Sequence, residues 1–197
     1  PMNLSGARAL AVGAGLTLAL AMGAAPTAAM AEVRVGTTDV TVKADISNVS
    51  FKAPTVIPFA AQADGTLVGP SDKTITIDNL SAYGIHVTNM KVTAKNDWAI
   101  VADAKTGSAQ NSIDFKVGPD KAEKDASSAT QTTGLDLSKD ANFDMKYEGI
   151  ADGTDKIKLN VSGHVARVTR DIFRVTGEGD QVATITWTVE PGAHATS

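Results

Sequence analysis

Near the end of the chain, the stretch Ala183-Thr184-Ile185-Thr186-Trp187-Thr188-Val189-Glu190 alternates apolar and polar residues without a break. Successive side chains of a β-strand point to opposite faces, so the apolar residues share one face and the threonines share the other. A strand with one buried face and one wet face is typical of antiparallel sheets. This stretch therefore predicts an antiparallel strand, and similar stretches elsewhere extend the prediction to the whole chain.

Apolar residues recur with the same period of two in five further stretches. They are Val40 and Val42; Ile75 and Ile77; Ile113, Phe115 and Val117; Phe143, Met145 and Tyr147; and Ile157, Leu159 and Val161. Turn signals separate these stretches. The turn Ala63-Asp64-Gly65-Thr66 is one of them, and Ala151-Asp152-Gly153-Thr154-Asp155 is predicted to close a hairpin between the strands on either side of it.

The stretch from Ile85 to Ala94 changes parity partway along. Ile85 and Val87 lie on odd positions, whereas Met90, Val92 and Ala94 lie on even ones. A straight strand cannot bury both sets, because a shift of one residue reverses the two faces. The sequence therefore predicts a β-bulge or a bend near Thr88 and Asn89.

Two other regions do not read as regular strands. Pro54 and Pro58 predict an extended edge segment, since proline cannot donate to a strand ladder. Residues 118–141 are polar and too long for an ordinary hairpin loop, which leaves open a short helical turn or a mobile loop.

The first 31 residues have the pattern of a secretory signal peptide. Arg8 precedes an uncharged apolar run from Ala9 to Met22, and Ala29-Met30-Ala31 provides a small-residue cleavage site before Glu32. The apolar run is shorter than the ~20 residues that span a bilayer. We expect a secreted domain at residues 32–197, with no stable membrane insertion after cleavage.

Composition narrows the classes of partner. Asp and Glu total 22 against 18 Lys and Arg, and aromatic residues make up 5% of the chain. Nucleic acids and anionic membranes call for a basic surface, and base stacking calls for aromatic side chains, so neither class of partner is expected. The absence of cysteine excludes thiol chemistry and disulfides, which leaves a secreted fold held by its core alone.

The two tryptophans, Trp98 and Trp187, are each followed two residues later by an aliphatic residue, Ile100 and Val189. This spacing resembles the two Trp-x-Leu motifs of the WxL domain, a cell-wall-binding module of Gram-positive surface proteins. The chain has Ile and Val where that family usually has Leu, and Glu190-Pro191 where it has Asp-Ala-Pro. The resemblance implies non-covalent attachment to peptidoglycan, with Trp98, Ile100, Trp187 and Val189 as the candidate wall-binding motif.

The position of each tryptophan within its stretch suggests a different role. Trp187 shares parity with Ile185 and Val189, and Trp98 shares parity with Ile100, so both rings lie on predicted apolar faces. Exposed rings would stack on sugar faces, whereas rings on apolar faces pack in a core. Core packing is the favoured interpretation, in which case the motif marks the fold and the ligand surface lies elsewhere.

Signals for catalysis or metal binding are absent from the sequence. His86, His164 and His194 stand alone, with no His-Glu-x-x-His stretch, and no Gly-x-Ser-x-Gly elbow is found. Asp and Gly cluster in turns, but no stretch matches an EF-hand calcium loop. We expect no catalytic residues, no cofactor and no metal.

Together these patterns predict an all-β protein: a single antiparallel β-sandwich at residues 32–197, with a long polar loop at about 118–141. The predicted function is non-catalytic attachment of a secreted surface protein to the cell wall, with peptidoglycan or other surface proteins as partners. The alternative is a subunit of a surface filament that self-assembles by β-strand donation, with Val33 to Val42 as the donated segment.

Overall fold

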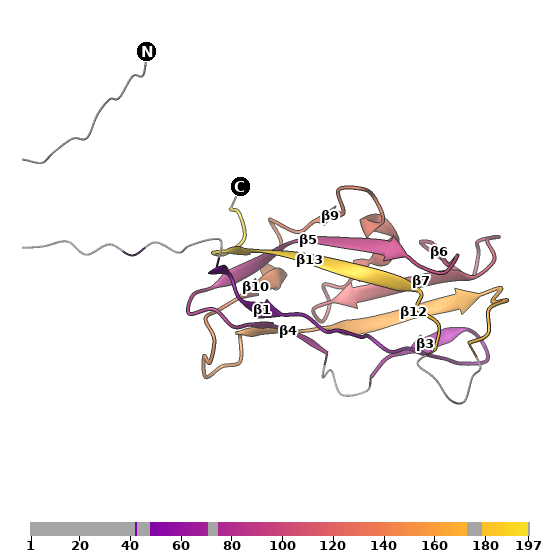
Figure 1. Cartoon of the computed structure of the whole chain (residues 1–197), viewed down its shortest axis with the longest axis horizontal. Helices are drawn as coiled ribbons and strands as arrows, with labels where there is room; N and C mark the ends of the chain where they lie inside the picture. Colours follow the sequence, from indigo (N-terminus) through magenta and orange to yellow (C-terminus); the bar gives the residue numbers. More distant parts are fainter. Residues whose placement is uncertain (1–41, 43–47, 71–74, 173–178, 197) are drawn as a thin grey trace, which may run out of the picture. The chain divides into compact units, whose positions relative to one another are not determined.

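The computed structural model describes residues 42, 48–70, 75–172 and 179–196, and the part from residue 48 onward forms an all-β domain (Figure 1). The strands are β1 (Phe51–Lys52), β2 (Ala60–Ala61), β3 (Thr66–Val68), β4 (Thr76–Asn79), β5 (Ile85–Ala94), β6 (Ala99–Ile100), β7 (Ser112–Gly118), β8 (Lys124–Asp125), β9 (Leu135–Asp136), β10 (Asp144–Met145), β11 (Lys156–Lys158), β12 (Asn160–Ala166) and β13 (Ala183–Pro191). Two short 3-10 helices, η2 (Ala126–Ala129) and η3 (Ala141–Phe143), lie between strands. The predicted signal peptide and Val40 lie outside the described residues.

The strands form three sheets. One has the order β10-β5-β13, with β9 also paired with β5; another has the order β2-β3-β12-β7-β6, with β8 also paired with β7; the third has the order β1-β4-β11. Among the described strands the pairings are antiparallel, as predicted, except for the short parallel pair of β6 and β7. The longest pairing joins β5 to β13, and these two strands run side by side along one margin of the domain in Figure 1.

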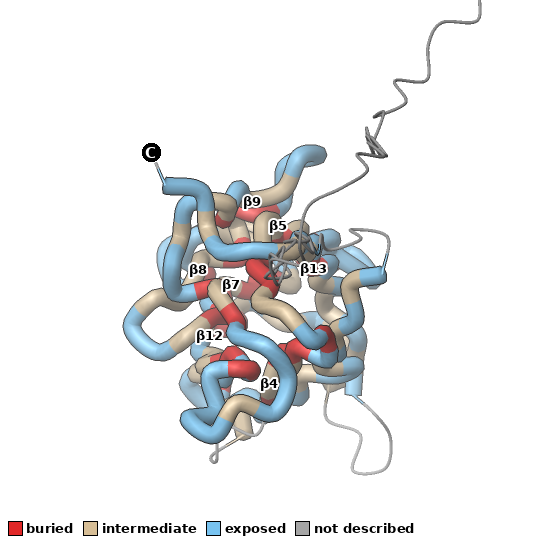
Figure 2. Tube along the Cα trace, turned by 90° about the vertical axis from the view of Figure 1, so that its left-hand side faces the viewer, coloured by how far each residue is buried: buried red, intermediate tan, exposed pale blue. Residues whose placement is uncertain are grey.

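One hydrophobic core unites the sheets. Ile77 of β4, Val92 of β5 and Val117 of β7 are all fully or almost fully buried in the same cluster. Figure 2 shows buried stretches in β4, β5, β7, β12 and β13. The predicted alternation of Ile113, Phe115 and Val117 is confirmed, because these residues are buried while Lys116 between them is exposed.

The predicted irregularity in β5 is confirmed as a bulge at Thr88. Thr188 of β13 pairs with Asn89, and the next residue, Val189, pairs with Val87, so Thr88 has no partner in the ladder. The extra residue switches the parity of β5, which keeps Val87 and Met90 both fully buried. The carbonyl of Thr88 accepts a hydrogen bond from the amide of Leu137 at 2.8 Å.

Two sequence predictions about residues 143–158 are wrong. Phe143 belongs to η3, and Tyr147 is 51% exposed, so they do not continue a buried strand face with Met145. The turn at residues 151–155 does not close a hairpin ladder, because β10 pairs with β5 whereas β11 pairs with β4. The turn carries the chain from one sheet to another. Met145 and Ile157 on its two sides are therefore buried in the same core from two different sheets.

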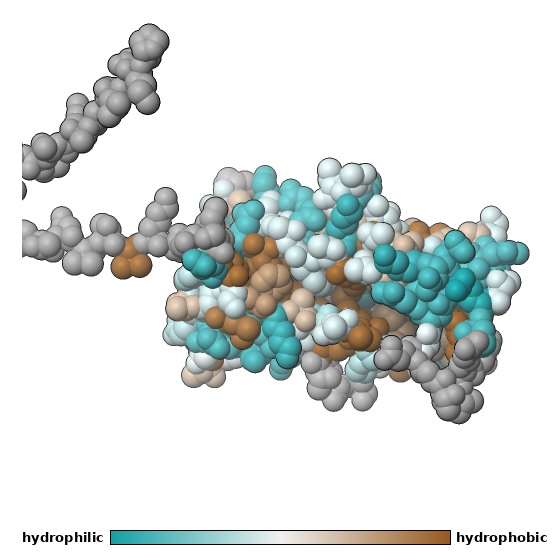
Figure 3. Space-filling model, in the orientation of Figure 1, coloured by the Kyte–Doolittle hydropathy of each residue, from teal (hydrophilic) through white to brown (hydrophobic). Residues whose placement is uncertain are grey.

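The regions predicted to be irregular are packed against the domain. Of the two alternatives for residues 118–141, the structure has the short helical turn, η2, whose Ala126 and Ala129 are fully buried. The region also includes β8 and β9. The segment between β1 and β2 is extended, with Ile57 and Phe59 packed against the core. Val56 of this segment is exposed. Figure 3 shows hydrophobic patches on the face that the segment crosses in Figure 1.

Candidate functional site

The distal tryptophan motif lies in the middle of β13. Trp187 is 9% exposed and pairs opposite Met90 of β5, and its neighbours on the same face, Ile185 and Val189, are half-buried against the core. The strand alternates as the sequence predicted, with Thr184, Thr186, Thr188 and Glu190 exposed. The indole is therefore a core side chain, in agreement with the favoured interpretation.

The proximal motif begins just after β5 ends. Trp98 is 4% exposed, and Ile100 behind it is half-buried. Asn96 and Asp97 have φ angles of 51° and 62°, and this left-handed pair turns the chain sharply before the ring. Asn and Asp tolerate such angles better than other non-glycine residues. The turn delivers Trp98 back onto the core beside the start of β13.

A polar cluster anchors the Trp98 ring. Its Nε1–H donates to Oδ2 of Asp180 at 2.8 Å, and Asn96 donates to Oδ1 of the same carboxylate at 3.0 Å. Arg170 forms an ion pair with Asp180. The hydrogen bond from Arg170 lowers the pKa of Asp180; burial opposes this effect, and the bonds from Trp98 and Asn96 add to it. Because Asp180 lies just before β13, the cluster ties the two tryptophan motifs together.

The outward side of the β5–β13 pair is a polar surface, which we call the threonine face. Thr184, Thr186 and Thr188 of β13 lie opposite Thr93, Lys91 and Asn89 of β5, and residues opposite each other in a ladder share a face. Asn89 in turn lies opposite Asp136 of β9. In Figure 3 the margin occupied by β5 and β13 is mostly pale or hydrophilic.

At the other end of this face, two histidines meet on one carboxylate. His86 is 2% exposed; its Nδ1 lies 2.7 Å from Oδ1 of Asp144 and its Nε2 lies 2.8 Å from the carbonyl oxygen of Leu137. His194 in the C-terminal tail lies 2.7 Å from Oδ2 of Asp144 through its own Nδ1. Both nitrogens of His86 therefore face acceptors, which commits the ring to structural hydrogen bonds.

The His86–Asp144–His194 cluster holds the tail against the sheet. Burial, the largest single influence, raises the pKa of Asp144, but hydrogen bonds from His194 and His86 together outweigh it and lower that pKa. The amide of Ala195 also donates to the carbonyl of Ser138 at 2.7 Å. Sequence reasoning treated these histidines as isolated, because nothing in the linear spacing of residues 86, 144 and 194 indicates their contact.

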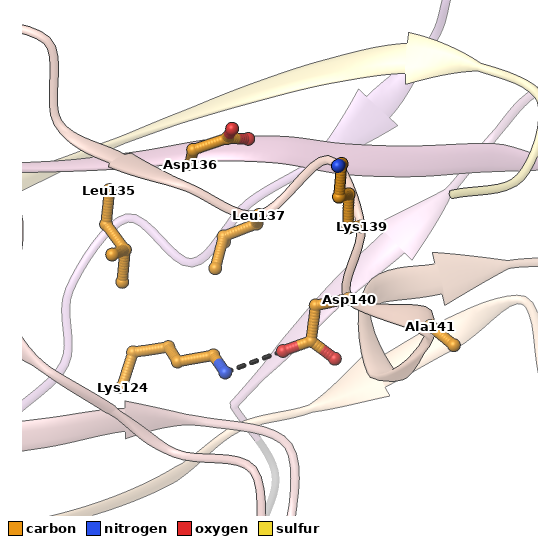
Figure 4. Close-up of a pocket in the computed structure, with 7 residues that line it drawn as sticks. All are labelled: Lys124, Leu135, Asp136, Leu137, Lys139, Asp140 and Ala141. Atoms are coloured by element: carbon orange, nitrogen blue, oxygen red, sulfur yellow. Dashed lines mark ion pairs between the residues drawn. The ribbon is translucent and has the colours of Figure 1, made fainter. Parts of the chain in front are cut away.

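A cleft of about 400 Å³ opens beside β8 and β9. Figure 4 shows Leu135 and Leu137 pointing toward the ion pair of Lys124 and Asp140, which spans 2.6 Å, while Asp136 points away from it. The amide of Ser138 donates to the Asp136 carboxylate at 2.8 Å. The charges of Lys124 and Asp140 thus satisfy each other, and the leucines give the cleft its apolar walls.

Within the described residues, no three His, Asp or Glu side chains gather as metal ligands. The helices of the described part are also too short and too polar to cross a membrane. No family model, no curated protein and no solved structure matches this chain.

Proposed function

We propose that this chain is a non-catalytic, secreted surface protein whose sheets form a β-sandwich that attaches non-covalently to cell-wall peptidoglycan. The observation that carries the proposal is the alternation of β13: Trp187 points into the core, and Thr184, Thr186 and Thr188 point outward. In this view the Trp-x-aliphatic motif holds the strand in register. The outward-facing threonines of β13 contact the cell wall.

The chemistry of the threonine face suits a neutral, hydroxyl-rich polymer. Side chains at every second residue of a strand recur at about 7 Å, so β13 presents a straight row of hydroxyls. Each hydroxyl is both a donor and an acceptor, which matches the hydroxyl and amide groups of a glycan. Across the ladder, Asn89 and Lys91 of β5 add an amide and a cation to the same face. Many weak contacts along a repeating ligand add up to useful avidity.

The state of His86 supports a non-catalytic role. His86 is almost fully buried, and Asp144 and the Leu137 carbonyl occupy its two nitrogens. A general base must have a free nitrogen within hydrogen-bond reach of the reacting group. The cluster instead holds the C-terminal tail against the sheet, so the hydrogen-bonding groups of His86 and Asp144 stabilise the fold.

A wall-sedimentation assay with the chain from residue 32 onward tests the proposal. Thr186→Val combined with Thr188→Val removes two hydroxyls but keeps the β-branched shape, and we expect at least a tenfold loss of binding to purified cell walls. The matched control is Thr55→Val with Thr106→Val, which changes two exposed threonines outside the β5–β13 sheet. Unchanged binding of the β13 variant, or an equal loss in the control, would contradict the role of the threonine face.

A second function, filament assembly by strand donation, is favoured by one observation. In the described part of the chain, β13 pairs on one side with β5 and has no partner on its other side. An unpaired edge can accept a strand from a neighbouring molecule. The candidate donor, Val33 to Val42, lies outside the described residues except for Val42.

Electron microscopy of the purified chain separates the two functions. Removal of residues 32–38 should leave wall binding intact, because attachment needs only the folded domain. If the full-length mature chain forms ordered fibres that vanish after this removal, strand donation is the function, and attachment is secondary.

A further inference from the structure

A second, larger cleft lies at the C-terminal end of β12. It measures about 570 Å³, within the range of ligand sites of about 300–1,000 Å³. The turn between β2 and β3 forms one wall, and the residues that follow the end of β12 form the other. Three of its lining residues, Asp64, His164 and Arg167, carry ionisable side chains. None of the three belongs to the threonine face.

His164 is a buried polar side chain that interacts electrostatically with the Asp64 carboxylate. It is 8% exposed and lines the cleft, and no hydrogen bond joins its ring to another residue in the described part of the chain. In the sheet it lies between Thr66 of β3 and Asp114 of β7. The ring nitrogens of His164 are not among the sealed, unpartnered polar atoms of the described residues, so they are open to the cleft and available to a ligand group.

Arg167 contributes a positive charge to the cleft, and its guanidinium is fixed by hydrogen bonds to uncharged acceptors. Its Nε donates to the carbonyl of Ala109 at 2.9 Å, and its Nη2 donates to the carbonyl of Ala104 and to Oγ of Ser112. These bonds use three of the five N–H groups of the guanidinium. The two on Nη1 have no partner among the described residues, and no described carboxylate forms an ion pair with this charge.

Asp64 brings the opposite charge to the same cleft. Thr66 fixes its carboxylate, through a backbone N–H at 2.9 Å and a hydroxyl at 3.0 Å. The neighbouring Gly65 has φ +87°, and a Cβ there would lie 2.2 Å from the carbonyl oxygen of Val165 and 2.8 Å from Nε2 of His164. Only glycine permits this close approach. The turn is therefore built tightly against the histidine, with its carboxylate at the rim.

The geometry points to a binding site for the zwitterionic backbone of a short peptide. The carboxylate end of the ligand meets His164 and the free N–H groups of Arg167, because guanidinium–carboxylate contacts are strong and directional. The ammonium end meets Asp64. Val168 and Ile172, which also line the cleft, contact the aliphatic part of the ligand. The inference is independent of the threonine face and concerns a different end of the domain.

Isothermal titration of the folded chain with the dipeptide alanyl-alanine tests the site. We expect a Kd in roughly the millimolar range, as befits so few ligand atoms. The N-acetylated dipeptide lacks the ammonium and the C-terminal amide lacks the carboxylate, and each should bind at least tenfold more weakly. Equal binding of all three ligands, or no heat with any of them, would overturn the proposal.

Variants of the chain complete the test, with a matched control in a second Asp-Gly-Thr turn. Asp64→Asn should weaken dipeptide binding about tenfold but leave binding of the N-acetylated form unchanged. In the other turn, Thr154 holds Asp152 through its backbone N–H and hydroxyl at 3.0 and 2.6 Å, and no atom lies near the Cβ position of Gly153. Asp152→Asn should leave binding unchanged; if it matches the loss in Asp64→Asn, the charge effect is non-specific and the site is refuted.

His164→Gln probes the buried wall of the cleft. It should abolish the preference for the free carboxylate over the amide. Tryptophan fluorescence reports whether this variant folds, because Trp98 and Trp187 are both buried. If it does not fold, the outcome of the exposed Asp64→Asn variant decides the proposal.

Discussion

The two tryptophan motifs have the same spacing, but they stabilise the domain in different ways. Trp187 sits in the middle of the longest strand pairing, opposite Met90, and its contribution is apolar packing within a ladder. Trp98 sits after a left-handed turn, outside any long ladder, and a hydrogen bond to Asp180 fixes its ring. In both motifs the ring is buried two residues before a half-buried aliphatic residue, and only the Trp98 ring is also held by a polar side chain among the described residues.

Replacement of either ring by alanine should have the largest effect on stability. Trp98→Ala and Trp187→Ala should each reduce the free energy of unfolding by about 3–5 kcal/mol, the usual cost of removing a large buried aromatic side chain. Denaturant titration followed by circular dichroism measures the change. A loss close to zero for Trp187→Ala would show that its ring does not belong to the core, and would return it to the candidate wall-binding residues.

Replacement by phenylalanine should separate the two motifs. Trp98→Phe keeps an aromatic ring but removes the donor to Asp180, and a hydrogen bond to a charged group is worth about 1.5–3 kcal/mol. In the described part of the chain, Trp187 has no comparable hydrogen bond, so Trp187→Phe should cost less than Trp98→Phe by roughly that amount. Equal costs for the two variants, measured in the same titration, would mean that the polar anchor contributes nothing.

Acid should weaken the Trp98 anchor before it affects the Trp187 ladder. The pKa of Asp180 in the folded chain is below its ordinary value of 3.8, chiefly because Arg170 donates to it. The unfolded chain takes up this proton first as the pH falls, so the stabilisation is complete above about pH 4 and is lost through the folded-state pKa. Asp180→Asn should flatten the acid limb of the stability curve, whereas Trp187→Phe should leave its slope unchanged.

The smallest effect is expected on the outward side of the Trp187 motif. Thr188→Val changes an exposed position of a strand and keeps a β-branched side chain, so the free energy of unfolding should stay within about 0.5 kcal/mol of the original. Thermal unfolding provides the measurement. A larger loss would show that Thr188 supports the ladder itself, in which case reduced wall binding by the threonine variants would have a structural cause.

Much of the fold could be predicted from local alternation. The strands around Ile113, Ile157 and Trp187 follow a period of two, and the bulge at Thr88 follows from the parity change in β5. The partnership of strands was harder to predict, because it depends on contacts between distant segments. The turn at residues 151–155 has ordinary hairpin chemistry, yet the strands on either side pair with β5 and β4.

The candidate site was only partly visible in the sequence. Parity predicted that both tryptophans face the core, but not that Asp180 meets Trp98, since the two residues are far apart along the chain. His86 and His194 meet only because Asp144 lies between them. His164 gives no signal in the sequence, because its significance depends on a cleft that two separate segments enclose.

The bulge at Thr88 makes the domain sensitive to chain length at one position. The bulge reverses the direction of the apolar side chains: before it they face the core from odd positions, Ile85 and Val87, and after it from even positions, Met90 and Val92. Loss of this one residue would leave the composition almost unchanged, yet it would turn Ile85 and Val87 outward or Met90 and Val92 outward. The carbonyl that receives the Leu137 amide would disappear as well. A deletion or insertion here therefore requires a compensating change in the hydrophobic pattern of half of β5. A substitution of Thr88 keeps the number of residues and requires no such change.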